Sequence, residues 1–198
     1  MKKIPFRKSL LATTLVLSIS LTSCKNETTP ADSKEVAEEQ NEAVVDDAKE
    51  ELNEVEDNSQ VYIDATEFDL TQKELAVLAQ KRAMSPDIKA LAKKIADGHD
   101  TSLKELADAT KDKGIAVPTT LTENGKKEVE ALNKEKGQDF DVEYIDKAIT
   151  SHRDAIQKFQ NEASKAKNPE VKAWLDKKVV ELQGHFDMIN DLIAKSRK

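Results

Sequence analysis

The sequence is poor in residues that break helices or form covalent cross-links: it has one cysteine, five glycines and five prolines among 198 residues. A single cysteine excludes a disulfide framework within the chain and a multi-cysteine metal site. With so little glycine and proline the segments between turns are long, and none shows the alternating apolar pattern of a convincing strand. A glycine-rich phosphate loop, a nucleophile elbow and a paired-carboxylate motif are also absent, so no familiar catalytic site is indicated.

The N-terminus has the three parts of a secretion signal. Four basic residues precede the apolar run Leu10–Leu21, and small residues lead to Cys24. The run is short of the roughly 20 residues that a membrane-spanning helix needs, and its place after a positive start is typical of a signal peptide. The stretch Leu21-Thr22-Ser23-Cys24 resembles the lipobox of bacterial lipoproteins. We therefore expect residues 1–23 to be removed and Cys24 to be lipidated; an ordinary signal peptide with a coincidental cysteine is the alternative.

Lipidation would decide where the protein resides. The multiply acylated cysteine that the lipobox resemblance implies holds a protein firmly to a membrane. Lys25 stands where an aspartate would be a familiar inner-membrane retention signal in some bacteria, which favours the outer membrane over the inner one. The expected location is the cell envelope, with the membrane as a partner through the lipid on Cys24.

Residues 24–58 are predicted to form an acidic spacer. From residue 25 to residue 58 there are 13 acidic residues, 3 basic residues and no aromatic residue. Such a segment buries too little apolar surface to offset the entropy lost on ordering, so we predict a disordered linker in which residues 33–55 visit the helical state. It acts as a solvated arm or, alternatively, binds a cationic partner. Residues 59–198 are close to neutral, so no basic face for nucleic acid is expected.

Residues 59–198 have the size of one domain and contain four long segments with apolar residues at helical spacing. Ser85-Pro86-Asp87 and Asn168-Pro169-Glu170 each offer a capping residue, a proline at the first helical position and an acid in the first turn. Each motif therefore marks a tight turn between two helices. A short helix near Thr122–Lys136 leads to a third long helix from about Asp139. The predicted fold is all-α, an antiparallel four-helix bundle built from two helical hairpins with a short connecting helix.

A family resemblance supports this architecture. The motif Phe140-Asp141-x-x-Tyr144, the Pro-acid-x-Lys turns and the histidines in the middle of the helices resemble the bacterial domain of unknown function 4142 family. That family is grouped with ferritin-like bundles and often occurs in secreted or outer-membrane proteins, and the similarity runs from about Gln60 to Ile193. The family pattern commonly has an acid at the position of Gln72 and Asp-His at that of Gly98-His99. This chain keeps the histidine and lacks both acids.

Three histidines and one glutamine are predicted to face the core. His99, His152 and His185 each have apolar neighbours three or four residues away on both sides, and Gln72 is placed in the same way on the first long helix. Gln72 and His99 are nearly equidistant from the proline of the first turn, as His152 and His185 are from the proline of the second. Because an α-helix rises about 1.5 Å per residue, the members of each pair are level. We expect one central polar layer.

This layer has the donors of a metal site. Three neutral imidazoles with an open fourth position suit zinc, copper or a related ion. A ferritin-like di-iron site needs Glu-x-x-His on two helices, but the residues three before the histidines are Ala96, Ile149 and Leu182, so neither di-iron oxidase nor iron-storage chemistry is expected. The alternative is a metal-free, hydrogen-bonded layer that fixes the register of the helices.

Two functions follow from these observations. The first is a non-catalytic envelope lipoprotein whose bundle binds an envelope partner or lends structure, since no catalytic residue is indicated. The alternative is a metal-binding or redox and stress-related protein that uses His99, His152 and His185, with Gln72 as a further layer partner. A zinc hydrolase is a third, weaker hypothesis because no general base shares the stripe. The sequence leaves enzymatic activity open and favours its absence.

Overall fold

The computed structural model describes residues 31–46, 53–111 and 113–196, which belong to one compact unit. These residues form six α-helices: α1 (Ser33–Asp46), α2 (Asn53–Arg82), α3 (Pro86–Lys111), α4 (Glu123–Lys134), α5 (Gly137–Lys165) and α6 (Pro169–Ser196). No β-strand occurs in these ranges, which confirms the all-α prediction. The predicted signal peptide and the lipidation site Cys24 lie outside the described residues.

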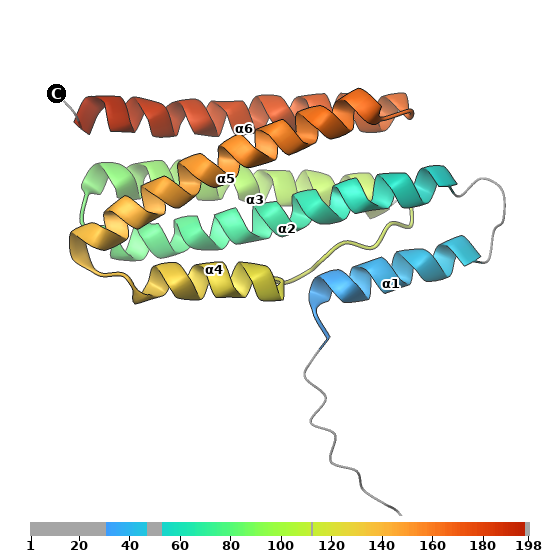
Figure 1. Cartoon of the computed structure of the whole chain (residues 1–198), viewed down its shortest axis with the longest axis horizontal. Helices are drawn as coiled ribbons and strands as arrows, with labels where there is room; N and C mark the ends of the chain where they lie inside the picture. Colours follow the sequence, from blue (N-terminus) through green and yellow to red (C-terminus); the bar gives the residue numbers. More distant parts are fainter. Residues whose placement is uncertain (1–30, 47–52, 112, 197–198) are drawn as a thin grey trace, which may run out of the picture. The chain divides into compact units, whose positions relative to one another are not determined.

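The four long helices form two hairpins, α2–α3 and α5–α6 (Figure 1). The hairpins meet where α2 packs on α5 and α3 packs on α6, while the short helix α4 packs on α2 and α5. Both hairpin turns are capped as predicted. The Asn168 side-chain oxygen accepts from the Glu170 backbone N–H at 2.9 Å, and the Ser85 hydroxyl accepts from the Ile88 backbone N–H at 3.3 Å. These bonds satisfy N–H groups that have no partner inside their own helix.

The connecting helix is also confirmed. Thr122 precedes α4 in an extended conformation, and its hydroxyl accepts from the Gly125 backbone N–H at 3.1 Å. An added Cβ on Gly125 would lie 2.6 Å from the Thr71 hydroxyl oxygen of α2. Glycine therefore lets α4 approach α2 closely, and this approach shapes the pocket described below.

The predicted disordered linker differs from the structure over Ser33–Asp46, which form helix α1 packed on α2. Ala37 and Asn41 of α1 are buried. The Asn41 side chain donates to the Ala116 carbonyl at 2.9 Å and accepts from the Ala116 N–H at 2.7 Å. These two hydrogen bonds to the loop after α3 stabilise the ordered helix. The composition of the segment does not indicate them. Helix α2 likewise begins at Asn53, ahead of the predicted boundary at residue 59.

The Phe140-Asp141-x-x-Tyr144 motif ties α5 to the first hairpin turn. Both aromatic rings are buried, at 1% and 2% exposure. Between them, the two Asp141 carboxylate oxygens accept from the Met84 and Ser85 backbone N–H groups, each at 2.8 Å. A carboxylate is also favoured at the positive N-terminal end of α3. The motif is therefore a structural clamp.

The core consists of two apolar clusters, each built from α2, α3, α5 and α6. Leu75, Ile95, Tyr144 and Ile189 belong to one, and Tyr62, Leu106, Phe159, Leu175 and Leu182 belong to the other. Along α3, His99 stands between Ile95 of the first cluster and Leu106 of the second. A polar layer that contains His99 thus divides the apolar core into two parts.

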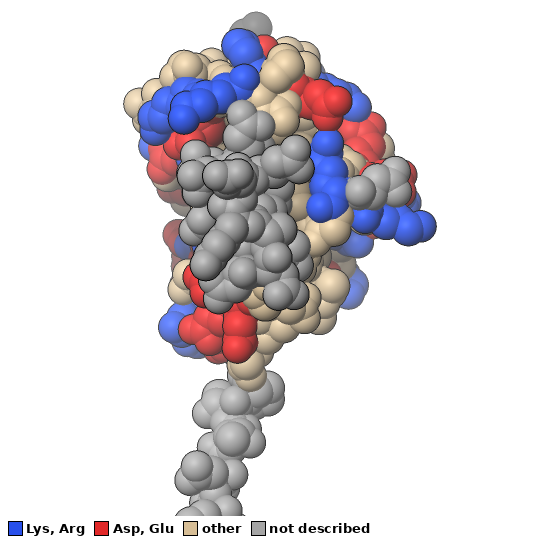
Figure 2. All heavy atoms as spheres, turned by 90° about the vertical axis from the view of Figure 1, so that its right-hand side faces the viewer, with Lys and Arg blue, Asp and Glu red and all other residues tan. Residues whose placement is uncertain are grey.

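The outer surface carries both signs of charge. On the face shown in Figure 2, Lys and Arg side chains lie interspersed with Asp and Glu. Many of the ion pairs are local and exposed, such as Lys93 with Asp97 at 2.6 Å, and pairs of this kind contribute little to stability. Within the described residues, none of the helices is long and apolar enough to cross a bilayer.

Replacing the clamp should destabilise the fold. Asp141→Ala leaves the Met84 and Ser85 N–H groups without their charged acceptor, so the free energy of unfolding should fall by about 2 kcal/mol. Urea unfolding followed by circular dichroism measures this change. Asp146→Ala removes an exposed carboxylate from the same helix and should change stability by no more than about 0.5 kcal/mol. Equal losses in the two variants would contradict the assignment.

Candidate metal centre

The structure brings the three histidines together in the middle of the core. His99 of α3, His152 of α5 and His185 of α6 are buried, at 0%, 0% and 6% exposure. Their ring centroids are 4.8 to 5.4 Å apart in pairs. One ring nitrogen of each lies within 4.8 Å of the others. The polar layer predicted from the spacing along the helices therefore exists for these three residues.

The hydrogen bonds of two rings determine where their lone pairs point. The Nδ1 of His99 is 2.8 Å from the Asp69 carboxylate, and the Nδ1 of His152 is 2.7 Å from the Ala148 carbonyl. Both partners can only accept, because Asp69 is ionised (see below), so each Nδ1 carries a proton, and a neutral ring then has its lone pair on Nε2. The two Nε2 atoms are 3.3 Å apart. With both rings neutral, two acceptors would face each other at this distance, an arrangement that a shared proton or a cation relieves.

Asp69 belongs to a buried ion pair beside the histidines. Its exposure is 0%, and its two carboxylate oxygens lie 2.6 and 2.8 Å from the Lys178 ammonium, which also donates to the Ser102 hydroxyl at 2.6 Å. Burial alone would raise the pKa of Asp69, but the charge of Lys178 and the hydrogen bond from His99 outweigh it and lower this pKa. The carboxylate is therefore ionised and holds the His99 ring in one orientation.

Burial keeps His152 and His185 neutral. Loss of hydration, together with the neighbouring histidines, holds the pKa of His152 well below its usual value. Burial, followed by the influence of His99 and Lys178, lowers the pKa of His185 to about 3. Neutral imidazole is the form that binds metal ions, so at neutral pH these rings have their ligand lone pairs available.

His185 is placed by the glycine beside His99. A Cβ added to Gly98 would lie 2.4 Å from the Nε2 of His185, so any larger residue would displace this ring. The ring fills the space beside position 98. Its Nδ1 is buried and has no hydrogen-bond partner within the described part of the chain. An unpaired buried nitrogen is uncommon and is a free ligand atom.

Asp69 and Lys178 were missed by the sequence analysis, although the helix stripes contain them. Lys178 occupies the α6 stripe together with His185. Asp69 lies three residues before Gln72, on the α2 stripe. A charged residue in a core stripe on each of two helices is a signal for a buried ion pair, because unpaired buried charges are very costly.

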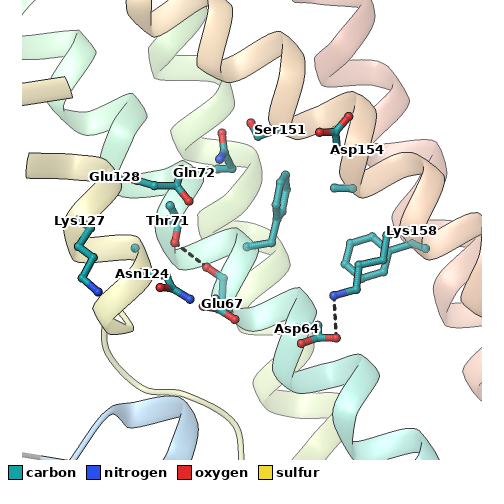
Figure 3. Close-up of a pocket in the computed structure, with 14 residues that line it drawn as sticks. Asp64, Glu67, Thr71, Gln72, Asn124, Lys127, Glu128, Ser151, Asp154 and Lys158 are labelled. Atoms are coloured by element: carbon teal, nitrogen blue, oxygen red, sulfur yellow. Dashed lines mark hydrogen bonds and ion pairs between the residues drawn. The ribbon is translucent and has the colours of Figure 1, made fainter. Parts of the chain in front are cut away.

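Gln72 is buried at 3% exposure, but no hydrogen bond joins it to the histidines among the residues that the structure describes. It lines a pocket between α2, α4 and α5, where Figure 3 shows it beside Thr71 and Glu128. Phe68, one turn earlier on α2, lies edge-on to the rings of both His99 and His152, with ring centroids 5.5 Å apart in each pair.

The chain is similar to one family and to one solved structure. A family model described as "Domain of unknown function (DUF4142)" matches residues 44–192. The solved structure is CopM in its Cu(II)-bound form, at 20% identity and a TM-score of 0.56, covering 70% of this chain and 96% of the CopM chain. At this identity the likeness shows the fold alone. No curated protein matches the chain.

The buried neutral histidines should make the metal-free protein sensitive to acid. The pKa of His185 is about 3 in the folded chain and about 6.5 when unfolded. Between these values the unfolded chain binds more protons, so the free energy of unfolding should fall as pH decreases, by up to about 1.4 kcal/mol per pH unit for each such histidine. Urea unfolding from neutral pH to about pH 4.5 tests this. His185→Gln should make the pH dependence shallower, whereas an unchanged slope would show that His185 is not the titrating group.

Proposed function

This chain belongs to the DUF4142 family, whose description names no activity, and we propose from its own geometry that it binds a transition-metal ion at His99, His152 and His185. The ligand atoms are the Nε2 atoms of the first two residues and a ring nitrogen of His185. Zinc and copper suit this set, because both are bound well by imidazole. The architecture that goes with the proposal is an antiparallel, ferritin-like bundle of α2, α3, α5 and α6.

The distance between the Nε2 atoms of His99 and His152 carries this proposal. Two imidazoles bound tetrahedrally to one ion at about 2.0–2.1 Å have nitrogens roughly 3.3–3.4 Å apart. The two Nε2 atoms are 3.3 Å apart. The third nitrogen, within 4.8 Å, reaches a common ion after an approach of about 1.5 Å.

The surroundings of the histidines fit such an ion. Metal-binding histidines commonly donate their other N–H to a carboxylate or a carbonyl, which fixes the ring and makes it a better ligand. Asp69 does this for His99, and the Ala148 carbonyl does it for His152. Copper receives further support from the fold shared with CopM, whose solved structure is a Cu(II)-bound form.

The bound ion is proposed to be carried or held by the protein, with no catalytic reaction. Asp69 is engaged with Lys178 and His99 and is no free base. Glu181, which approaches Lys178 at 3.4 Å, has its pKa raised mainly by burial. A non-catalytic module with a metal-free layer is the second candidate, favoured if a proton shared by His99 and His152 takes the place of the ion.

Metal content decides between the two. The chain, with Cys24→Ser to remove its only thiol, would be stripped of metal, exposed to zinc, copper, manganese and iron, desalted and analysed by mass spectrometry. We expect about one zinc or copper ion per chain, held by the three histidines. The double variant His99→Gln/His152→Gln should retain almost none. Thr110→Ala, which truncates a buried polar residue whose hydroxyl donates to the Leu106 carbonyl at 2.8 Å, is the matched control and should bind metal as the parent does.

Absence of metal from the parent protein would overturn the metal site. The polar layer would then serve helix register, and the surface would become the place to search for function. Metal retained by the double variant would instead show that another site binds it. Circular dichroism of each variant, recorded in parallel, separates loss of ligand from loss of fold.

The lipid anchor remains part of the proposal. A lipid on Cys24 would tether the helical domain to the envelope, with the outer membrane favoured by Lys25. In bacteria that process lipoproteins, the parent protein should be found in the membrane fraction and Cys24→Ser in the soluble periplasmic fraction, because a single substitution removes every acyl chain. Membrane association that persists in this variant would contradict the anchor.

A further inference from the structure

A pocket of about 540 Å³ lies between α2, α4 and α5 (Figure 3). Its rim is exposed and charged, with Lys127 and Glu128 from α4 and Asp154 and Lys158 from α5. Its inner residues are less exposed and include Gln72 and Ser151. The pocket therefore leads from solvent towards the core.

Phe68 forms the wall between this pocket and the histidines. The side chain is half-buried and lines the pocket. Its ring also lies edge-on to His99 and His152, with centroid distances of 5.5 Å to both. One aromatic ring thus touches the pocket on one side and two proposed metal ligands on the other.

Gln72 offers its side-chain amide to an occupant of the pocket. Its residue exposure is 3%, and it lines the pocket, yet its side-chain amide makes no hydrogen bond within the described part of the chain. The protein leaves these amide atoms to partners that enter the pocket. Water molecules, or a cation bound to the amide oxygen, would be such partners.

The oxygen atoms around Gln72 suit a hydrated cation. The Ser151 hydroxyl donates to the Lys147 carbonyl at 2.7 Å, and the Thr71 hydroxyl donates to the Glu67 carbonyl at 2.9 Å. Both hydroxyls therefore keep lone pairs for another partner. Figure 3 places Gln72, Thr71 and Ser151 around one space, with Glu128 and Asp154 nearby. Neutral oxygens inside and carboxylates at the rim can replace water around a divalent ion.

We infer that this pocket is the entry site through which a hydrated divalent transition-metal ion reaches the three histidines. The ion first binds Glu128 and Asp154 at the rim. It then exchanges water ligands for the oxygens of Gln72 and Ser151. It reaches the histidines when the Phe68 ring rotates away. No bond is made or broken in the protein, and only water and ligand oxygens are exchanged for imidazole nitrogens. This inference rests on the proposed metal site.

The first arm of the test removes the wall. Zinc uptake and its release to excess chelator would be timed by stopped-flow absorbance on the Cys24→Ser protein. Phe68→Ala should speed both processes by about tenfold or more, while the amount of zinc bound per chain stays the same. Trp174→Ala is the matched control: it truncates a half-buried ring that packs on Tyr62 with centroids 4.8 Å apart, three helical turns before His185, and should leave both rates unchanged.

The second arm blocks the pocket. Ser151→Cys, placed in the same Cys24→Ser background, would be capped with a bulky methanethiosulfonate reagent, which should slow zinc uptake by about tenfold or more. Removal of the cap by reduction should restore the rate. Thr150→Cys, an exposed position beside Ser151 that does not line the pocket, should bind zinc at the parent rate with or without the cap.

The outcomes separate the two proposals. If the parent protein binds no zinc or copper, the metal site and its entry route both fail. If it binds metal but neither Phe68→Ala nor the capped Ser151→Cys changes the rates relative to their controls, the metal site stands and this route is wrong. Faster exchange in the first variant together with slower uptake in the second supports the route.

Discussion

The buried carboxylate of Asp69 is the group on which the arrangement of the polar layer depends. It is fully buried, and it is bonded to the Lys178 ammonium and to the His99 ring. An ionised group in such a place is tolerated only with close partners, and the loss of one partner of a buried pair costs about 3–5 kcal/mol. Because Asp69, His99 and Lys178 come from α2, α3 and α6, this network specifies how these three helices align. A slip of one turn between α2 and α6 would leave a buried charge alone, and a slip of α3 would remove His99 from Asp69.

This network also prepares the histidines before any ion arrives. Asp69 fixes the proton of His99, the Ala148 carbonyl fixes that of His152, and Gly98 leaves the space that His185 occupies. The rings are therefore held largely in position without an ion. Binding a ligand would then cost little conformational entropy. The same rigidity would serve a purely structural layer. What distinguishes the two roles is the group between the two Nε2 atoms: a metal ion in a binding site, or a shared proton in a structural layer, where a donor then meets an acceptor.

The fold was largely predictable because its signals are local. The starts of α3 at Pro86 and α6 at Pro169 follow from capping residues that act within one turn. The burial of the three histidines follows from their spacing on helix stripes. In contrast, the packing of α1 depends on the bonds between Asn41 and Ala116, residues 75 positions apart. Composition correctly indicated that this segment favours helix, but composition says nothing about a distant loop that completes its hydrogen bonds.

By itself the sequence determined that the four long segments are helical, where the hairpins turn and that the three histidines face inward, because each of these follows from signals within a single helix. Only the tertiary structure decided that Asp69, rather than Gln72, is the partner of His99, and that Lys178 neutralises that carboxylate. It also decided that Phe68 lies between a surface pocket and two imidazoles. These contacts depend on how each helix is rotated about its axis and shifted along it relative to helices from other parts of the chain. A shift of a few ångströms between two helices changes which neighbouring side chains are in contact. The spacing of residues within one helix does not determine this shift.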